Sequence, residues 1–316
     1  MQREYSLKEV RIGERSRRRV RWMRRLLPPI VSFLSLFPRH FTVRSQIRMA
    51  GRLPDQLAAL SVGYQIFSRV PAMTLGALEG HAGPVVLYLH GGGFLMPAIP
   101  RAHLGFHARL CAALGAVGVM PDYRLAPLHA YPAALDDCEM VYRELLDRGV
   151  DPSRIVLAGE SAGGNLVLGL LQRIRKAGLP YPVCAVPISP VTEVARVHAP
   201  PSRRDKAKVD AMIPITSFSK VILYYAAGAD ASDPELSPVF ADYQGFPPLY
   251  FLVGEDEILL DDSLLAHQQA LKAGVQSQVD VWPVLPHAFP LLAGWFPEAR
   301  QALTDIVEFS RQHLPA

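Results

Sequence analysis

A serine flanked by glycines is the sharpest chemical signal in this sequence. Ser161 lies in the hexapeptide GESAGG (159–164), after the apolar run IVLA and before a segment of helical length. A serine on a tight strand-to-helix turn projects its hydroxyl above a sheet as a nucleophile, and the small residues two positions before and after it allow a close backbone approach. The free amides of the helix N-terminus also favour negative charge there. The pattern therefore predicts acyl transfer at Ser161.

A glycine-rich loop, HGGGF (90–94), stands upstream of this serine and follows the apolar run VVLYL. Acyl transfer builds negative charge on a carbonyl oxygen, and preorganised main-chain amides stabilise that charge. Glycines let such amides turn toward the oxygen without obstruction. We expect oxyanion donors among Gly91, Gly92 and Gly93, with the last two favoured, and a further donor from Ala162. Neither GxGxxG nor GK[ST] spacing is present, so a nucleotide loop is not expected.

A serine nucleophile needs a general base and an acid that orients it. In a strand-turn-helix hydrolase the acid and then the histidine follow the serine in the chain. His287 fits, because it follows the apolar run VDVWP and precedes the last segment of helical length. The acid is predicted within GEDEILLDD (254–262), which follows the run LYFLV.

Two acidic residues of this segment stay open as the orienting acid. Asp256 and Glu257 are nearest the strand end, and either carboxylate can accept a hydrogen bond from an imidazole. Asp261 and Asp262 stand where an N-cap is expected for a helix beginning near residue 263. Glu160, beside the serine, is interpreted as a structural group that bonds to nearby backbone, to Tyr123 or to Arg124.

The elements that must position these residues alternate along the chain from about residue 80, as in a parallel βαβ sheet covered on both faces. The predicted strands are 85–89, 117–121, 155–158, 183–188, 249–253 and 279–282. The predicted helices are 104–114, 134–148, 162–177, 263–273 and 298–313. We therefore predict a basic N-terminal cap segment over 1–60 and a catalytic domain over 61–316, with 192–233 as an insertion that contributes to the cap.

The N-terminal segment carries most of the excess positive charge. Between Arg3 and Arg52 there are fourteen Lys or Arg and three Glu, whereas the net charge of the whole chain is only +4. No nucleic-acid-binding motif accompanies these residues, so a nucleic-acid partner is not expected. The apolar run LLPPIVSFLSLF (26–37) is too short to span a bilayer and fits poorly with a secretory signal. Peripheral contact with an anionic membrane and a cap over the substrate pocket remain the two interpretations.

The cysteine content favours a reducing compartment. Cys111, Cys138 and Cys184 are widely spaced, odd in number and without a CxxC pair, so no disulfide framework is expected. We expect a cytoplasmic protein, peripheral to a membrane if the basic segment binds one. No metal or cofactor is predicted, and the oligomeric state is left open, a homodimer included.

Several motifs together resemble one known family. HGGGF (90–94), DYRLAP (122–127), YPAALDD (131–137) and GESAGGNL (159–166) stand in the order found in the hormone-sensitive-lipase family, the bacterial family IV esterases. The resemblance covers about 80–312. It implies an α/β-hydrolase fold with a mostly parallel central sheet, helices on both faces and a helical cap, and it implies hydrolysis of short to medium acyl esters without a metal.

The resemblance also bears on the acid. The family places it in a DxLxD register about thirty positions before the histidine, and that register begins here at Glu257. The resemblance thus favours Glu257 over Asp256. Other functions stay open: an amidase or arylacetamide-type deacetylase, a lipase for longer chains, and a ligand-binding protein that has kept the fold without the chemistry.

Overall fold

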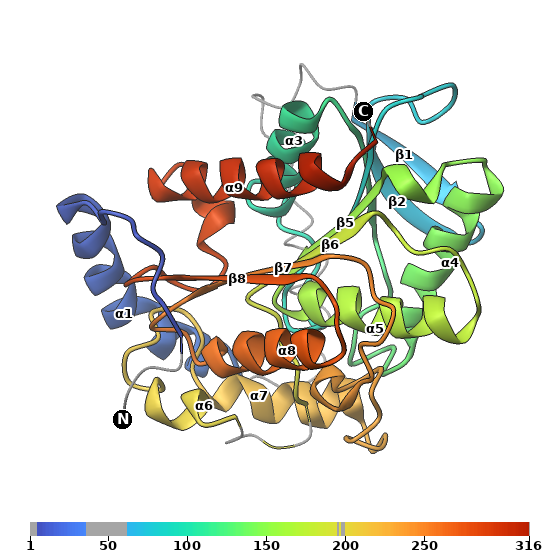
Figure 1. The fold of residues 1–316 in the computed structure, drawn as a ribbon. Coiled ribbons are helices and arrows are strands. Elements are labelled where there is room, and N and C mark those ends of the chain that lie inside the picture. The colour runs from blue at the N-terminus through green and yellow to red at the C-terminus, as the bar shows by residue number, and fades with distance from the viewer. Residues whose placement is uncertain (1–4, 36–61, 195, 197–199, 316) are drawn as a thin grey trace.

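The computed structural model describes residues 5–35, 62–194, 196 and 200–315 (Figure 1). A single eight-stranded sheet has the order β1-β2-β4-β3-β5-β6-β7-β8. Its strands are β1 (Val62–Phe67), β2 (Val70–Leu75), β3 (Val85–Leu89), β4 (Val117–Pro121), β5 (Ile155–Glu160), β6 (Cys184–Ile188), β7 (Leu249–Gly254) and β8 (Ser277–Trp282). Strands β3 to β8 are parallel, whereas the β1–β2 hairpin joins β4 in antiparallel fashion. The predicted mostly parallel sheet is confirmed.

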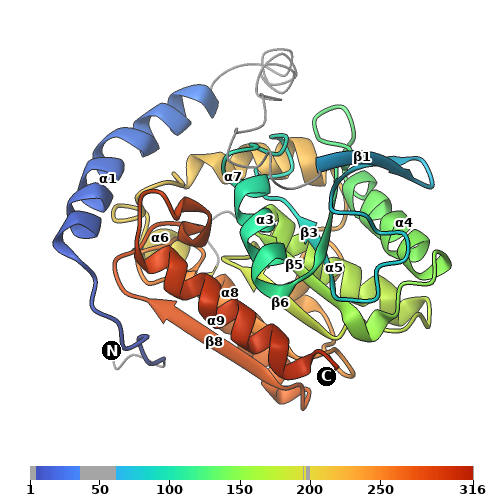
Figure 2. The same ribbon diagram turned by 90° about the horizontal axis from the view of Figure 1, so that it is seen from above.

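Helices cover both faces of this sheet. The α-helices are α1 (Glu14–Ser35), α3 (His103–Leu114), α4 (Ala133–Asp147), α5 (Ala162–Lys176), α6 (Ser202–Asp205), α7 (Thr216–Lys220), α8 (Leu260–Lys272) and α9 (Glu298–His313). The short helices are η2 (Pro152–Arg154), η3 (Val221–Ala226), η4 (Pro238–Phe240) and η5 (Phe289–Leu292), of which η3 is a π-helix. Helices α4, α5 and α8 pack on one face, and α3 and α9 on the other (Figures 1 and 2).

The central strands are buried along their whole length. Apart from Glu160 at the end of β5, strands β3 to β7 carry no charged residue, as expected for strands that helices cover on both faces. The six predicted strands match β3 to β8 within two residues at each end. The hairpin of β1 and β2 was not predicted from the sequence.

The order of the strands brings the two glycine-containing motifs together. Strand β3 pairs directly with β5, with Leu89 opposite Gly159. The loops that follow these strands therefore start side by side at the carboxyl edge of the sheet. Open α/β sheets bind their ligands at this edge, where the strand order reverses.

The described N-terminal residues run along the far edge of the sheet before α1 begins. Leu7 pairs with Val281 of β8, and the amide of Lys8 donates to the carbonyl of Val281 over 2.8 Å. The Lys8 ammonium lies 2.6 Å from a carboxylate oxygen of Asp280. This segment covers an edge strand that would otherwise present unpaired amides and carbonyls.

Helices α6, α7 and η3 all lie within the predicted insertion, 192–233. Helix α1 packs near them, since Ser32 Oγ lies 3.3 Å from Thr216 Oγ1 of α7. Residues 36–61 of the predicted N-terminal cap lie outside the described residues. None of the described helices has both the length and the apolar character needed to cross a membrane.

The three cysteines are buried and unpaired. Cys111 and Cys184 belong to the core cluster packed around α3 and α9, and Cys138 to the cluster on the opposite face of the sheet. Burial raises the pKa of all three thiols, in the case of Cys184 to about 12.

Candidate active site

Ser161 lies at a strained turn between strand β5 and helix α5. Its φ of 57° and ψ of −119° are a combination that residues with a side chain rarely adopt. Glu160 ends the strand and Ala162 begins the helix, so the turn consists of this one residue. Such strain at a single serine is typical of a nucleophile elbow.

The glycines on either side of Ser161 are required by the neighbouring strand. A Cβ atom built on Gly163 would lie 1.9 Å from the carbonyl oxygen of Leu89, and one on Gly159 would lie 2.6 Å from the same oxygen. Both distances are far shorter than any real contact of a Cβ atom. The predicted role of the two small residues, a close backbone approach, is confirmed.

The glycine-rich loop lies directly against the serine. A Cβ atom on Gly91 would lie 3.1 Å from Cβ of Ser161. Gly92 and Gly93 have φ values of 115° and 62°, a region that favours glycine. The amide of Gly91, however, donates to Glu160 Oε1 over 2.5 Å. The prediction of Gly91 as an oxyanion donor is therefore wrong, because its only N–H group already has a partner.

Glu160 links the glycine-rich loop to helix α3. Besides the Gly91 amide, its carboxylate accepts hydrogen bonds from the Tyr88 hydroxyl and from His103 Nε2, the latter at 3.0 Å. Burial would raise the pKa of this carboxyl, but His103, Tyr88 and the Gly91 amide outweigh burial and lower it. Glu160 is thus an anionic group that fixes the start of the loop. Its predicted structural role agrees with these contacts.

Of the partners expected for Glu160, the nearby backbone is confirmed at Gly91, but the two side chains are not. Tyr123 donates to the carbonyl of His90, and Arg124 pairs with Asp137, so neither reaches Glu160. His103 and Tyr88 were not identified from the sequence. The main-chain amide of Ile99 donates to Nδ1 of His103 over 2.7 Å, which leaves the proton of a neutral ring on Nε2, toward Glu160.

His287 and Glu257 form a buried pair. His287 Nδ1 lies 2.7 Å from Glu257 Oε2. The other oxygen, Glu257 Oε1, accepts from the Gly254 amide over 2.6 Å and from Ser189 Oγ over 2.8 Å. With the proton of the neutral ring on Nδ1, Nε2 keeps the lone pair that a general base requires.

The electrostatic surroundings favour a protonated His287. Burial lowers the pKa of its imidazole, but the charge and the hydrogen bond of Glu257 outweigh burial, and Asp210 and Glu160 add to the effect. The net result is a raised pKa. A positive charge that forms on His287 during a reaction is therefore stabilised.

Asp256, the alternative acid, faces a different partner. Its carboxylate forms an ion pair with Arg24 of helix α1 at 2.8 Å, and a quarter of its side chain remains exposed. Of the two acids left open by the residues themselves, the structure brings Glu257 and not Asp256 to His287.

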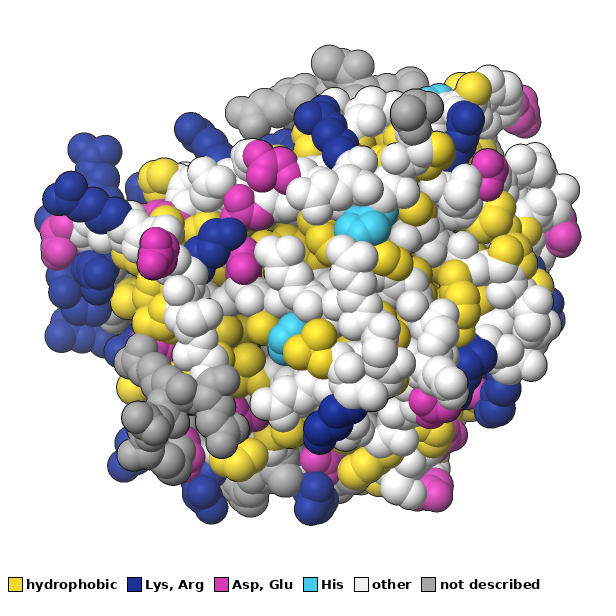
Figure 3. Space-filling view, viewed as in Figure 1, with side chains coloured by type: hydrophobic (Ala, Val, Ile, Leu, Met, Phe, Trp, Pro, Cys, Tyr) yellow, Lys and Arg dark blue, Asp and Glu magenta, His cyan; other side chains and the backbone are white. Residues whose placement is uncertain are grey.

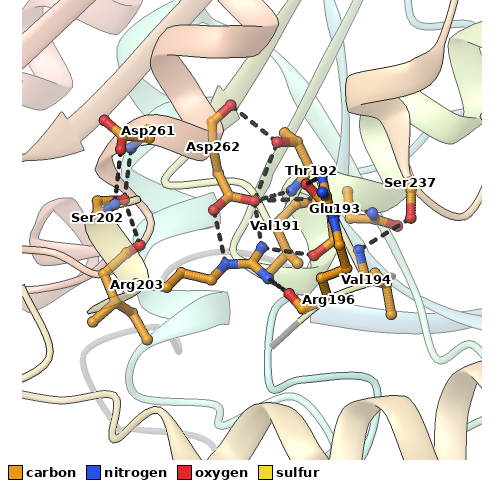
Figure 4. Close-up of polar contacts among 12 residues, drawn as sticks. Val191, Thr192, Glu193, Val194, Arg196, Ser202, Arg203, Ser237, Asp261 and Asp262 are labelled. Atoms are coloured by element: carbon orange, nitrogen blue, oxygen red, sulfur yellow. Dashed lines mark hydrogen bonds and ion pairs between the residues drawn. The ribbon is translucent and has the colours of Figure 1, made fainter. Parts of the chain in front are cut away.

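Asp261 and Asp262 do not cap helix α8. The helix begins at Leu260, earlier than predicted, so both residues lie in its first turn. Figure 4 shows that both carboxylates instead bind the insertion. Asp261 accepts from the Ser202 amide over 2.7 Å, and Asp262 pairs with Arg203 at 2.7 Å in a contact from which water is fully excluded. The cap prediction is wrong because the helix starts within the acidic segment and not after it.

Asp210 ties segment 192–233 to the loop that carries Glu257. This buried carboxylate accepts hydrogen bonds from the amides of Met212, Ile213 and Ile258. Burial raises its pKa, and the three amides oppose that shift. Ile258 directly follows Glu257, so the hydrogen bond to Asp210 fixes the main chain next to Glu257.

No group of three or more His, Cys, Asp or Glu side chains in the described part of the chain is arranged to hold a metal ion. The structure places a strained serine after β5, against the glycine-rich loop, and a histidine paired with a glutamate after β8, at the same edge of the sheet. This set can perform nucleophilic acyl transfer.

Comparison with known proteins agrees with this geometry. A family model described as the alpha/beta hydrolase fold matches residues 86–291. An acetyl-hydrolase from Streptomyces hygroscopicus is 36% identical over 229 residues, 72% of this chain and 76% of that protein. The carboxylesterase/phospholipase LipF from Mycobacterium tuberculosis is 36% identical over 284 residues, 87% of this chain and 70% of that protein.

Solved structures give the same result. An esterase/lipase from an uncultured bacterium has a TM-score of 0.84 and 33% identity, covering 96% of this chain and 100% of that chain. An esterase described as a member of the bacterial hormone-sensitive lipase family has a TM-score of 0.82 and 32% identity over the same shares. The chain therefore belongs to the hormone-sensitive lipase family of α/β hydrolases.

Proposed function

We propose that this protein hydrolyses carboxylic esters of small molecules with short to medium acyl chains, through a covalent acyl-enzyme on Ser161. The observation that carries the proposal is the strained elbow at Ser161, which lies against the glycine-rich loop at the sheet edge where the buried Glu257–His287 pair forms. The names of the relatives, esterase, carboxylesterase and acetyl-hydrolase, support an ester as the substrate class.

The first half of the reaction forms the acyl-enzyme. Nε2 of His287 takes the proton of Ser161 Oγ while that oxygen attacks the ester carbonyl carbon. Glu257 holds the Nδ1–H group and stabilises the imidazolium. The alcohol then leaves with the proton that His287 returns, and Ser161 keeps the acyl group.

The second half releases the acid. A water molecule gives its proton to His287 and attacks the acyl carbon, and the protonated histidine then restores Ser161. In both halves negative charge develops on the carbonyl oxygen. The amides of Gly92, Gly93 and Ala162 are proposed to donate to it, while Glu160 holds the loop at Gly91.

The insertion is proposed to cap the acyl side of this site. Its helix η3 packs against the glycine-rich loop, because Val221 Cγ2 would lie 3.6 Å from a Cβ atom on Gly93. The ring of Tyr225 stacks on Phe94 with centroids 3.6 Å apart and planes 2° apart. Bulky side chains thus stand next to the proposed oxyanion donors, where they can limit the length of the acyl chain.

Hydrolysis of a p-nitrophenyl ester series from acetate to palmitate tests the proposal. We expect Ser161→Ala to lower kcat by about 10⁶, and Glu257→Gln to lower it by about 10⁴ because the neutral amide favours the wrong imidazole tautomer and does not stabilise the imidazolium. Asp256→Asn is the matched control, one residue away, and should stay within about threefold of wild type. Circular dichroism confirms that each variant is folded.

The outcomes separate the remaining functions. The highest rate on an ester between acetate and octanoate supports an esterase. The highest rate on palmitate would instead make the protein a lipase. Turnover of p-nitroacetanilide in preference to p-nitrophenyl acetate would make the protein an amidase. A folded wild type that turns over neither substrate would refute catalysis at Ser161.

We also propose that the protein is cytoplasmic, because three unpaired cysteines suit a reducing compartment. A homodimer stays a prediction, which light scattering on the purified chain can test.

A further inference from the structure

Helix α1 carries a dense positive charge on its exposed side. It contains seven arginines and one glutamate. Lys and Arg side chains gather over α1 at the left of Figure 3, where they stand out from the body of the molecule. Arg15, Arg18 and Arg25 are exposed and have no partner within the described residues. A helix with so many unneutralised arginines attracts a surface of opposite charge.

The exposed side of α1 also carries an apolar stripe. Trp22, Leu26 and Ile30 follow one another at four-residue spacing, which places them on one side of the helix. They are exposed by 52%, 41% and 51%. Trp295, exposed by 46%, extends the stripe, with its ring centroid 6.1 Å from that of Trp22. We name these four residues the α1 stripe.

The opposite side of α1 is held firmly by the protein. Val20 and Met23 are buried in the core. Ser16 Oγ donates to Glu298 over 2.7 Å, and Arg24 pairs with Asp256 at 2.8 Å. The stripe therefore cannot turn inward without breaking these contacts, and the described residues leave it exposed.

We propose that the outer side of α1, with Trp295, docks the protein onto an anionic phospholipid bilayer. Arginines beside large apolar side chains fit such a surface, because the guanidinium groups bind lipid phosphates while tryptophan and leucine enter the boundary between headgroups and acyl chains. Each basic residue near an anionic membrane adds about fivefold to the affinity. A nucleic acid would use the arginines but leave Leu26 and Ile30 in water, so the stripe favours the bilayer.

Sedimentation with vesicles tests the proposal on the full chain. Vesicles contain either phosphatidylcholine alone or equal parts of phosphatidylcholine and phosphatidylglycerol. We expect binding to the phosphatidylglycerol vesicles at 50 mM NaCl and its loss at 500 mM NaCl, because salt screens exposed charges. The triple variant Arg15→Gln/Arg18→Gln/Arg25→Gln should bind about 100-fold more weakly.

A matched variant controls for net charge alone. Arg69, Arg101 and Lys272 are also exposed and unpaired within the described residues, and none of them lies on α1. Their replacement by glutamine removes the same charge and should leave vesicle binding within about threefold. Equal weakening by both triple variants would overturn the proposal, as would equal binding to both kinds of vesicle.

The apolar part has its own readout. The chain has three tryptophans, and Trp282 is fully buried, so a blue shift of tryptophan fluorescence on adding vesicles reports on Trp22 and Trp295. Trp22→Ser should reduce both the shift and the affinity. If Trp22→Ser leaves vesicle binding intact while the chain binds duplex DNA more tightly than phosphatidylglycerol vesicles, the occupant is a nucleic acid and the proposal fails.

Docking and hydrolysis are separable. Ser161→Ala should bind vesicles like wild type, and the α1 triple variant should hydrolyse soluble p-nitrophenyl butyrate like wild type. Failure of the esterase proposal therefore leaves this one to be judged on binding alone.

Discussion

Replacing Arg203 by methionine tests how segment 192–233 is held to helix α8. Arg203 and Asp262 are both fully buried, and the carboxylate accepts from Nε and one terminal nitrogen of the guanidinium at 3.2 and 2.7 Å. The amides of Thr192 and Glu193 donate to the same carboxylate. Methionine keeps much of the side-chain volume but leaves Asp262 as a buried anion without a counter-ion.

The expected cost is large. Breaking a buried ion pair by removing one partner destabilises a protein by about 3–5 kcal/mol. With an unfolding entropy near 2.1 cal/mol/K per residue, this corresponds to a fall in melting temperature of about 5–8 °C for a chain of this length. Differential scanning calorimetry at pH 7 measures both quantities.

The pH dependence identifies the cause. Burial raises the pKa of Asp262, and Arg203 and the two amides oppose that shift, so removing Arg203 raises the pKa further. A carboxyl with a raised folded-state pKa binds its proton more tightly when folded, and the folded state gains stability as the pH falls through that pKa. The deficit of Arg203→Met relative to wild type should therefore be full at pH 8 and smaller at pH 5.

Two controls complete the experiment. Arg203→Met/Asp262→Asn removes the unpaired charge and should recover more than half of the loss. Arg143→Met breaks the exposed pair with Glu139 and should cost less than about 1 kcal/mol. A deficit for Arg203→Met that is independent of pH, or a double variant no more stable than the single one, would refute the reasoning.

Three further predictions concern the site. The specificity constant kcat/KM should rise with pH through the raised pKa of His287, because only the neutral ring accepts the serine proton. Glu257→Gln should move this rise in kcat/KM to lower pH, because the charge that raises the pKa is removed. Gly163→Ala should abolish activity and lower the melting temperature, since its Cβ would lie 1.9 Å from a carbonyl oxygen of β3, whereas Gly105→Ala, whose Cβ meets nothing closer than 3.5 Å, should be tolerated. His103→Phe should lower kcat at least about tenfold with KM little changed, because Glu160 loses one buried hydrogen bond and holds the glycine-rich loop less firmly. Calorimetry shows whether the variant is otherwise folded.

The parallel part of the fold was predictable because its pattern is local. Strands covered on both faces need continuous apolar runs, and helices between them end at glycines, so β3 to β8 could be placed within two residues. Strand β1 could not be placed, since its Tyr64 and Ile66 are exposed and its apolar residues do not mark a buried face. Helix α1 passes through Pro28 and Pro29, two residues that would predict a helix end.

The site residues also fall into those that the sequence can predict and those that it cannot. Ser161 and His287 could be proposed from the sequence because a motif and a position in the chain specify them. Choosing Glu257 over Asp256 needed the family register. His103, Tyr88 and Arg203 were not predicted, because their partners are distant in the sequence and only the folded chain brings them together. Gly91 was assigned to the wrong partner for the same reason: Glu160, its acceptor, is sixty-nine positions away.

Because its three cysteines are buried, the native chain should not react with thiol reagents, and a cysteine introduced at the surface can be labelled selectively. Each is inside a core cluster, and the raised pKa keeps its sulfur protonated and unreactive at neutral pH. A single cysteine introduced at an exposed position, such as Leu26→Cys, would therefore react alone. A spin label or fluorophore attached there would measure the depth of helix α1 in a bilayer without first removing any native cysteine.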